Sequence, residues 1–301
     1  MSSLTTEKNK LHFSGHESFA CKQFWLKKGF DFANALHSFN DDTAVVELGV
    51  GKNMVNSIRY WSKAFNIIKE NDTVTDFGTN IFSENGLDPY LEDNGTVWLL
   101  HYNLIKKNKA SIYSLLFNEF RKERVDFTKE QFHAFLKRKC NENDAEIKYN
   151  ENTINSDINV LLKNYSRPDS KTRLEIEDVF SNMFLDLDLI TNYKKRNIDE
   201  HLIDWYRIEG SNREELPIEI ILFVILDNFK NETSISFRQL LVGYNSPGSV
   251  FALTAEGLYN KIQQIVNKYS KTIVYSETAG NQVLQLKGNI NKWDILNEYY
   301  N

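Results

Sequence analysis

The segment from His12 to Cys21 gathers four side chains that can bind a metal ion. These side chains are His12, His16, Glu17 and Cys21. Histidine, cysteine and carboxylate are the ligands that zinc takes from proteins. However, Gly15 interrupts a helix that would bring both histidines to one face, and the spacing matches no established zinc motif. Glu17 also suits the first turn of a helix, where the helix dipole favours a carboxylate. We therefore favour a structural role and keep His16 and Glu17 as metal or catalytic candidates.

A second cluster is acidic. Asp88, Glu92 and Asp93 place three carboxylates within six residues, and His101 follows. Hard cations such as Mg²⁺ bind carboxylate oxygens. Asp88-Pro89 is also a turn signal, and acidic residues after such a turn commonly cap a helix. A solvated turn with a helix cap is the favoured interpretation, and these carboxylates are weaker metal candidates.

The run Gly49-Val50-Gly51-Lys52 resembles part of a nucleotide phosphate loop. Such a loop needs glycine five residues before the Gly-Lys pair and a Ser or Thr after it, where this sequence has Val46 and Asn53. Helix-capping residues rather than a strand precede the run. We therefore expect no nucleotide there and no other cofactor, and we predict that the glycines form a turn between two helices.

The helix after this turn carries a basic face. We predict a short helix ending at Leu48, a second helix from about Asn53 to Ile67, and a hairpin joining residues 67–69 to residues 73–75, which is the outline of a winged helix-turn-helix. In that motif the second helix enters the major groove of DNA. The candidate DNA-binding residues are Lys52, Asn53, Asn56, Arg59, Tyr60 and Lys63. The lysines and arginine would contact phosphates and the others base edges. Alternatively, the face is only solvated or binds protein.

The remaining chain predicts a fold that is mainly α with small β-hairpins, in which winged helix-turn-helix modules surround a helical middle. We place the domains at residues 1–95, 96–210 and 211–301. In the last, the apolar run from Ile218 to Phe229 predicts a buried helix, and Gly280-Asn281 predicts a hairpin. Capping signals at Thr128, Ser236 and Thr254 mark further helix starts.

Composition limits the classes of function. The net charge of −5 gives no general attraction to nucleic acid, so any DNA contact must come from a local basic face. Two cysteines 119 positions apart supply no disulfide framework. No apolar run is long enough for a membrane span, and the N-terminus lacks a secretory signal. We expect a cytoplasmic protein with no membrane partner.

Four ordered motifs resemble one bacterial family. They are FSGHESF from Phe13, WLKKG from Trp25, AVVELGVGKNMVNSIRYWSKAF from Ala44 and DPYLEDNGTVWLLHY from Asp88. This arrangement is similar to the domain of unknown function 4007 family. The resemblance implies an accessory role in DNA-modification systems of the phosphorothioation type, or in phage defence, beside a phosphosulfate-reductase-like partner enzyme. It implies no catalytic residues.

These observations predict a DNA-binding or adaptor component that brings a partner enzyme to double-stranded DNA. One alternative is a metal-dependent enzyme, such as a nuclease, that uses His16, Glu17, Asp88, Glu92 and Asp93. The other is a protein-binding scaffold without DNA contact.

Overall fold

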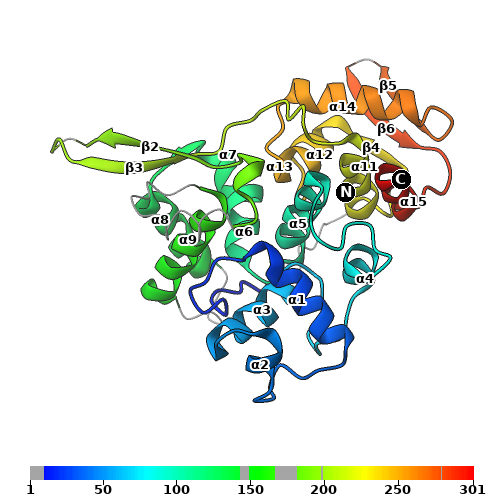
Figure 1. Ribbon diagram of the computed structural model, residues 1–301. Helices are drawn as coiled ribbons and strands as arrows, with labels where there is room; N and C mark the ends of the chain where they lie inside the picture. The colour runs from blue at the N-terminus through cyan, green and yellow to red at the C-terminus, as the bar shows by residue number, and fades with distance from the viewer. Residues whose placement is uncertain (1–9, 143–148, 167–181, 198, 279) are drawn as a thin grey trace.

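The structure is a computed structural model that describes residues 10–142, 149–166, 182–197, 199–278 and 280–301. Within these residues the chain is mainly α-helical and carries two three-stranded antiparallel sheets (Figure 1). The predicted fold class, mainly α with small β elements, is confirmed at this level. No helix in the described part of the chain is both long and apolar enough to cross a membrane.

The N-terminal segment is a group of four helices. They are α1 (Gln23–Asn34), α2 (Ala44–Leu48), α3 (Lys52–Ala64) and α4 (Asp76–Phe82). Ile58 and Trp61, in the apolar stripe of α3, are fully buried, and α1 packs across α3 and α4. The helix ends earlier than predicted because the chain turns back at Asn66, whose φ is 60°. The predicted hairpin is reduced to one bridge between Ile68 and Val74.

The middle segment combines helices with the first sheet. Its elements are α5 (Asn94–Lys107), α6 (Ser111–Leu115), the π-helix η1 (Leu116–Phe120), α7 (Arg121–Glu123), β1 (Asp126–Phe127), α8 (Lys129–Glu142), α9 (Glu151–Tyr165), the 3₁₀ turn η2 (Leu185–Leu187), β2 (Thr191–Arg196) and β3 (Leu202–Arg207). Thr128 and Gln131 form the predicted capping box at the start of α8. The strand order is β1-β3-β2. Beyond β1, strands β2 and β3 continue as a two-stranded ribbon that extends away from the helices (Figure 1).

The C-terminal segment repeats this strand order in the second sheet. Its elements are α11 (Ile218–Asn228), β4 (Ser234–Ser236), α12 (Phe237–Val242), α13 (Pro247–Val250), α14 (Ala255–Lys268), β5 (Ile273–Thr278), β6 (Asn281–Leu286) and α15 (Lys292–Tyr300). The strands lie in the order β4-β6-β5, so the predicted hairpin across Gly280 is confirmed. Ser236 and Thr254 cap α12 and α14 as predicted. Ser246 caps the short helix α13 by accepting a hydrogen bond from the backbone N–H of Ser249.

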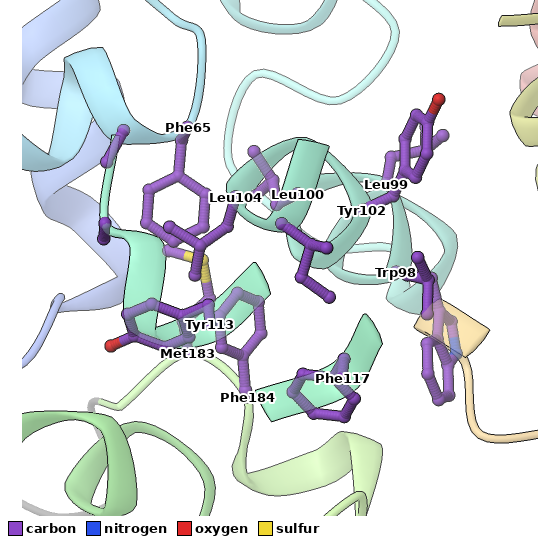
Figure 2. Packing of buried hydrophobic residues seen from close by; sticks show 14 of the residues in the cluster. Phe65, Trp98, Leu99, Leu100, Tyr102, Leu104, Tyr113, Phe117, Met183 and Phe184 are labelled. Atoms are coloured by element: carbon purple, nitrogen blue, oxygen red, sulfur yellow. The ribbon is translucent and has the colours of Figure 1, made fainter. Parts of the chain in front are cut away.

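Helix α5 lies at the centre of the molecule. Eleven consecutive residues, Gly95 to Ile105, are buried, so the helix is surrounded by protein on every side. Figure 2 shows its Leu104 in the same cluster as Phe65 of the N-terminal segment and Phe184 of the middle segment. The buried apolar residues of all three segments form one continuous cluster. The domain boundaries near residues 95 and 210 therefore stay predictions.

His101 of α5 joins two distant parts of the chain through its ring nitrogens. Nε2 lies 2.8 Å from the carbonyl oxygen of Val250, in α13. A carbonyl oxygen only accepts, so Nε2 carries the proton and Nδ1 accepts from the Tyr165 hydroxyl of α9 at 2.7 Å. The ring is fully buried, and this burial lowers the pKa of His101 to about 3.

We predict that His101→Phe lowers the free energy of unfolding by about 2–4 kcal/mol at pH 7, because the Tyr165 hydroxyl and the Val250 carbonyl lose a buried partner. The deficit should shrink as the pH falls from 7 to 5. In the wild type, the unfolded chain binds a proton near pH 6.5 that folded His101 binds only near pH 3, so acid destabilises the wild type more than the variant. Urea denaturation at both pH values measures this; an equal deficit at both would contradict it.

Candidate nucleic-acid interface

The loop that carries His16 is held closed by its own hydrogen bonds. His16 Nε2 lies 2.8 Å from Asp157 Oδ1, and the backbone N–H of Ser18 donates to His16 Nδ1 at 3.1 Å. Both ring nitrogens are therefore occupied, and no lone pair is left for a metal ion or a substrate proton. The ring also stacks on Trp61 with an interplanar angle of 13°. His16 positions this loop, while its neighbour Glu17 is exposed.

The acidic cluster forms a hydrogen-bonded contact between the start of α5 and the C-terminal helix. We call Asp88, Asp93 and Thr96 the clasp. Asp88 is buried and accepts hydrogen bonds from the backbone N–H groups of Glu92 and Asp93 and from the hydroxyl of Thr96. Asp93 caps α5 by accepting from the N–H of Gly95 at 2.6 Å. The helix cap at Asp93 agrees with the sequence interpretation, whereas the expected solvated turn is wrong for Asp88, whose side chain is buried.

Helix α15 docks on this clasp through two tyrosines. The Tyr299 hydroxyl donates to Asp93 Oδ1 at 2.8 Å, and the Tyr300 hydroxyl lies 2.6 Å from Thr96 Oγ1. The carboxylates of Asp88 and Asp93 thus serve protein groups, and Glu92 is exposed. Among the described residues, no group of three or more histidine, cysteine, aspartate or glutamate side chains is arranged to hold a metal ion.

The turn between α2 and α3 confirms one sequence prediction. A helix rather than a strand precedes Gly49, which adopts a left-handed conformation at φ 64° that glycine reaches without strain. A Cβ atom added at Gly49 or Gly51 would meet no atom within 4 Å, so the turn faces open space. Of the six candidate DNA-binding residues, Lys52, Asn53 and Asn56 are exposed beside this turn. These three keep their predicted place on the surface.

The other three candidates are bound to the protein or buried. Arg59 Nη2 lies 2.5 Å from Asp72 Oδ2, and Lys63 Nζ lies 2.9 Å from Asp72 Oδ1. These two contacts and their hydrogen bonds hold the pKa of Asp72 below its usual range, against the effect of burial. Lys63 is 9% exposed and also donates to the carbonyl of Glu70. The expectation that Arg59 and Lys63 point freely outward is wrong, because both fasten the turn after α3.

Tyr60 was also expected at the edge of the outer face, and this too is wrong. Its side chain is 9% exposed and packs against Gly15, where an added Cβ would lie 2.6 Å from the Tyr60 ring. Burial raises the pKa of the Tyr60 hydroxyl far above its usual range. Tyr60 therefore belongs to the contact between α3 and the His16 loop. It does not lie where a base edge could reach it.

Two surface features escaped the sequence reasoning. Helix α9 exposes Asn152, Asn155 and Asn159, whose spacings of three and four residues put the amides on one face. All six residues of β2, including Lys194, Lys195 and Arg196, are exposed. The asparagine spacing was visible in the sequence. The strand was not, because β2 lacks the alternation of apolar and polar residues that marks a half-buried strand.

Comparison with known proteins places the chain in a family. The model of the family described as protein of unknown function (DUF4007) matches residues 13–300. The chain belongs to the DUF4007 family. This family assignment agrees with the resemblance of the four ordered motifs. A search of curated proteins gave no match.

Two solved structures are similar to this DUF4007 protein over most of its length. One is described as the magnesium ion-bound SspB crystal structure, with a TM-score of 0.83 and 28% sequence identity. The other is described as the SspB crystal structure, with a TM-score of 0.81 and 27% identity. Each match covers 96% of this chain and 88% of the other. The overall fold is therefore shared with SspB.

We predict that Lys63→Ala lowers the free energy of unfolding by about 1–3 kcal/mol, because Asp72 loses a partly buried ionic partner. The matched control, Lys52→Ala, removes an exposed lysine from the same helix and should change stability by less than about 0.5 kcal/mol. Chemical denaturation of both variants measures the difference. Equal stabilities would show that Lys63 does not fasten the turn.

Proposed function

We propose that this DUF4007 protein is a DNA-binding or adaptor component of a bacterial DNA-modification or phage-defence system. The observation that carries the proposal is the repeated order of elements in the two sheets. In each, a first strand is followed by helices and then by two strands, and the third strand pairs with the first. We infer that these units, and the α2-turn-α3 unit in reduced form, are winged helix-turn-helix modules. Modules of this type present a helix or a β-ribbon to a DNA groove.

The exposed start of α3 supports contact with DNA. No side chain among the described residues caps the first N–H groups of this helix, and such groups favour a phosphate. Lys52 lies at the same point and would contact the DNA backbone, while Asn53 and Asn56 would reach base edges. Only one of these side chains is cationic. This surface alone would therefore bind weakly, and the whole protein needs a further basic surface.

The biological context remains a proposal supported by the family resemblance. That resemblance favours a cytoplasmic system of the phosphorothioation type and a phosphosulfate-reductase-like partner enzyme. An adaptor needs one surface for DNA and another for its partner. The amide-rich face of α9 and the exposed polar face of α14, which includes Asn260, Gln264 and Asn267, are available for contacts of either kind.

We predict that the full chain binds duplex DNA with little sequence preference and that the logarithm of affinity falls linearly with the logarithm of salt concentration, because phosphate contacts release counterions. The triple variant Lys52→Gln, Asn53→Ala, Asn56→Ala should bind less tightly and show a salt slope shallower by about 0.9, the effect of one lost phosphate contact. Fluorescence polarisation with a labelled duplex measures both quantities.

The variant Lys271→Gln is the control, because it removes an exposed charge outside α3. It should bind DNA as the wild type does. If the wild type shows no binding to duplex DNA even at low salt, the DNA-binding proposal fails. The protein-binding scaffold then becomes the better interpretation.

A metal-dependent enzyme is the second candidate, and one observation favours it. One of the similar SspB structures is described as magnesium ion-bound. In the present protein, the carboxylates of Glu17 and Glu92 are exposed and available to bind a cation. Asp88, Asp93 and His16 already form hydrogen bonds with protein groups. These residues do not by themselves form a complete magnesium site.

Incubation with supercoiled plasmid separates the two candidates. If the protein only binds DNA, the plasmid stays supercoiled with and without Mg²⁺. Cleavage that requires Mg²⁺, stops with a chelator and is lost in Glu17→Gln or Glu92→Gln would identify a nuclease. The conservative substitutions keep the side-chain size and remove only the negative charge, so a loss of cleavage would point to the cation.

A further inference from the structure

The β2–β3 ribbon projects from the molecule, and its base packs on the core through Tyr206. Figure 1 shows it reaching away from α8 and α9. All six residues of β2 are exposed, and Leu202, at the outer end of β3, is 62% exposed. Six residues of extended chain span roughly 20 Å. That length exceeds the depth of the DNA major groove, about 8.5 Å, so the ribbon is long enough to follow or enter a groove.

The base of the ribbon is anchored firmly to the middle segment. Tyr206 of β3 is buried against Phe127 of β1, with ring centroids 5.8 Å apart. Asp126 of β1 accepts hydrogen bonds from Arg207 at 2.7 and 3.2 Å and from the Tyr193 hydroxyl at 2.8 Å. These contacts fix the direction in which the ribbon points. A ligand bound along it would therefore be held in one orientation relative to the helices.

On one face of the ribbon, two stacked aromatic rings lie between two cations. The Arg207 guanidinium lies over the Tyr193 ring, at 5.6 Å from the centroid. Tyr193 stacks on Trp205 across the strand pair, and Lys195 lies over the Trp205 ring at 5.4 Å. The rings keep these flexible cations extended along the strand. Positioning in this way reduces the entropy that a lysine loses when it contacts a fixed anion.

The charge of β2 is suited to DNA. Lys194, Lys195 and Arg196 are three consecutive cations, and β2 contains no acidic residue. The other run of three cations, Lys137 to Lys139, lies on α8, where Arg138 pairs with Glu123 and Lys139 pairs with Glu119. Arg196 has one acidic neighbour, Glu200, but both side chains are more than 60% exposed, so the pair is screened by solvent. Asp204 of β3 is the register partner of Lys194, so the ribbon carries a moderate local excess of positive charge, which attracts a polyanion although the chain has a net charge of −5.

We propose that the β2–β3 ribbon is a DNA-contacting arm that binds the phosphates of duplex DNA through Lys194, Lys195 and Arg196. The inference rests on the proposed function, since it supplies the basic surface that α3 lacks. The ribbon carries the main electrostatic contact, and the start of α3 adds a smaller one. Neither strand packs on the core beyond its base, so the arm can engage DNA without a change in the helices.

The test uses the full chain and a labelled duplex in fluorescence polarisation titrations at several salt concentrations. The variant Lys194→Gln, Lys195→Gln, Arg196→Gln should lose at least about 10-fold in affinity at 100 mM salt, and its salt slope should be shallower by about 2.7, that is, about 0.9 for each lost phosphate contact. Thermal unfolding should match the wild type, because these side chains are exposed.

A charge-matched control removes three exposed lysines elsewhere, in the variant Lys230→Gln, Lys271→Gln, Lys287→Gln. It should retain most of the affinity and the slope. If both triple variants lose affinity equally, the effect is one of total charge and the arm is excluded. If the wild type binds DNA and the ribbon variant binds equally well, the proposed function stands and only the arm fails. If the wild type binds no DNA, both proposals fail together.

Discussion

The burial of His101 at the centre of the molecule is the constraint on which the arrangement of the rest depends. One imidazole ring binds Val250 of α13 and Tyr165 of α9, so α5 connects the C-terminal unit with the middle unit. Five aromatic rings, those of Trp98, Phe117, Tyr165, Phe184 and Phe251, surround it. In this apolar site the ring must stay neutral, and its two hydrogen bonds must be satisfied together. A shift of either unit would break one of them.

The same principle explains why the side chains that were candidates for catalysis or metal binding have structural roles. His16 and Asp157 lie 141 positions apart and meet in a buried pair that fixes the N-terminal loop against α9. Asp88 and Asp93 bind backbone N–H groups, and α15 closes over them through Tyr299 and Tyr300. A buried carboxylate or imidazole is tolerated only with partners, and here the partners come from the protein itself. The His16–Asp157 pair connects the first segment to the middle one, and the contacts of Tyr299 and Tyr300 connect the start of α5 to the last segment.

Because these histidine and aspartate side chains are bonded inside the protein, contact with other molecules depends on exposed surfaces elsewhere. Four such surfaces among the described residues are the start of α3, the amide row of α9, the polar face of α14 and the β2–β3 ribbon. Because the net charge of the chain is negative, each surface would attract a polyanion only as far as its own local charge allows. Among these surfaces, the ribbon has the highest local density of cations, and it also extends furthest from the core (Figure 1).

Local sequence determined the pieces of this fold whose signals lie within a few residues. The caps at Thr128, Ser236 and Thr254, the glycine turn at Gly49 and the hairpin across Gly280 were all predictable, because each depends on hydrogen bonds or backbone angles between near neighbours. The buried stripe of α3 was predictable for a similar reason, since helical periodicity places Ile58 and Trp61 on one side.

Tertiary structure alone decided which polar side chains remain on the surface. In the sequence, Lys52 and Lys63 are both lysines of one helix and cannot be told apart. Asp72 lies beside Lys63 only because the chain turns back after α3. Lys261 of α14 is buried, and it donates hydrogen bonds to the carbonyls of Glu214 and Leu216. The pairing of His16 with Asp157 has the same origin. Ion pairs and buried hydrogen bonds join residues that are distant in sequence. A local sequence pattern therefore does not predict which loop supplies the partner of a given side chain.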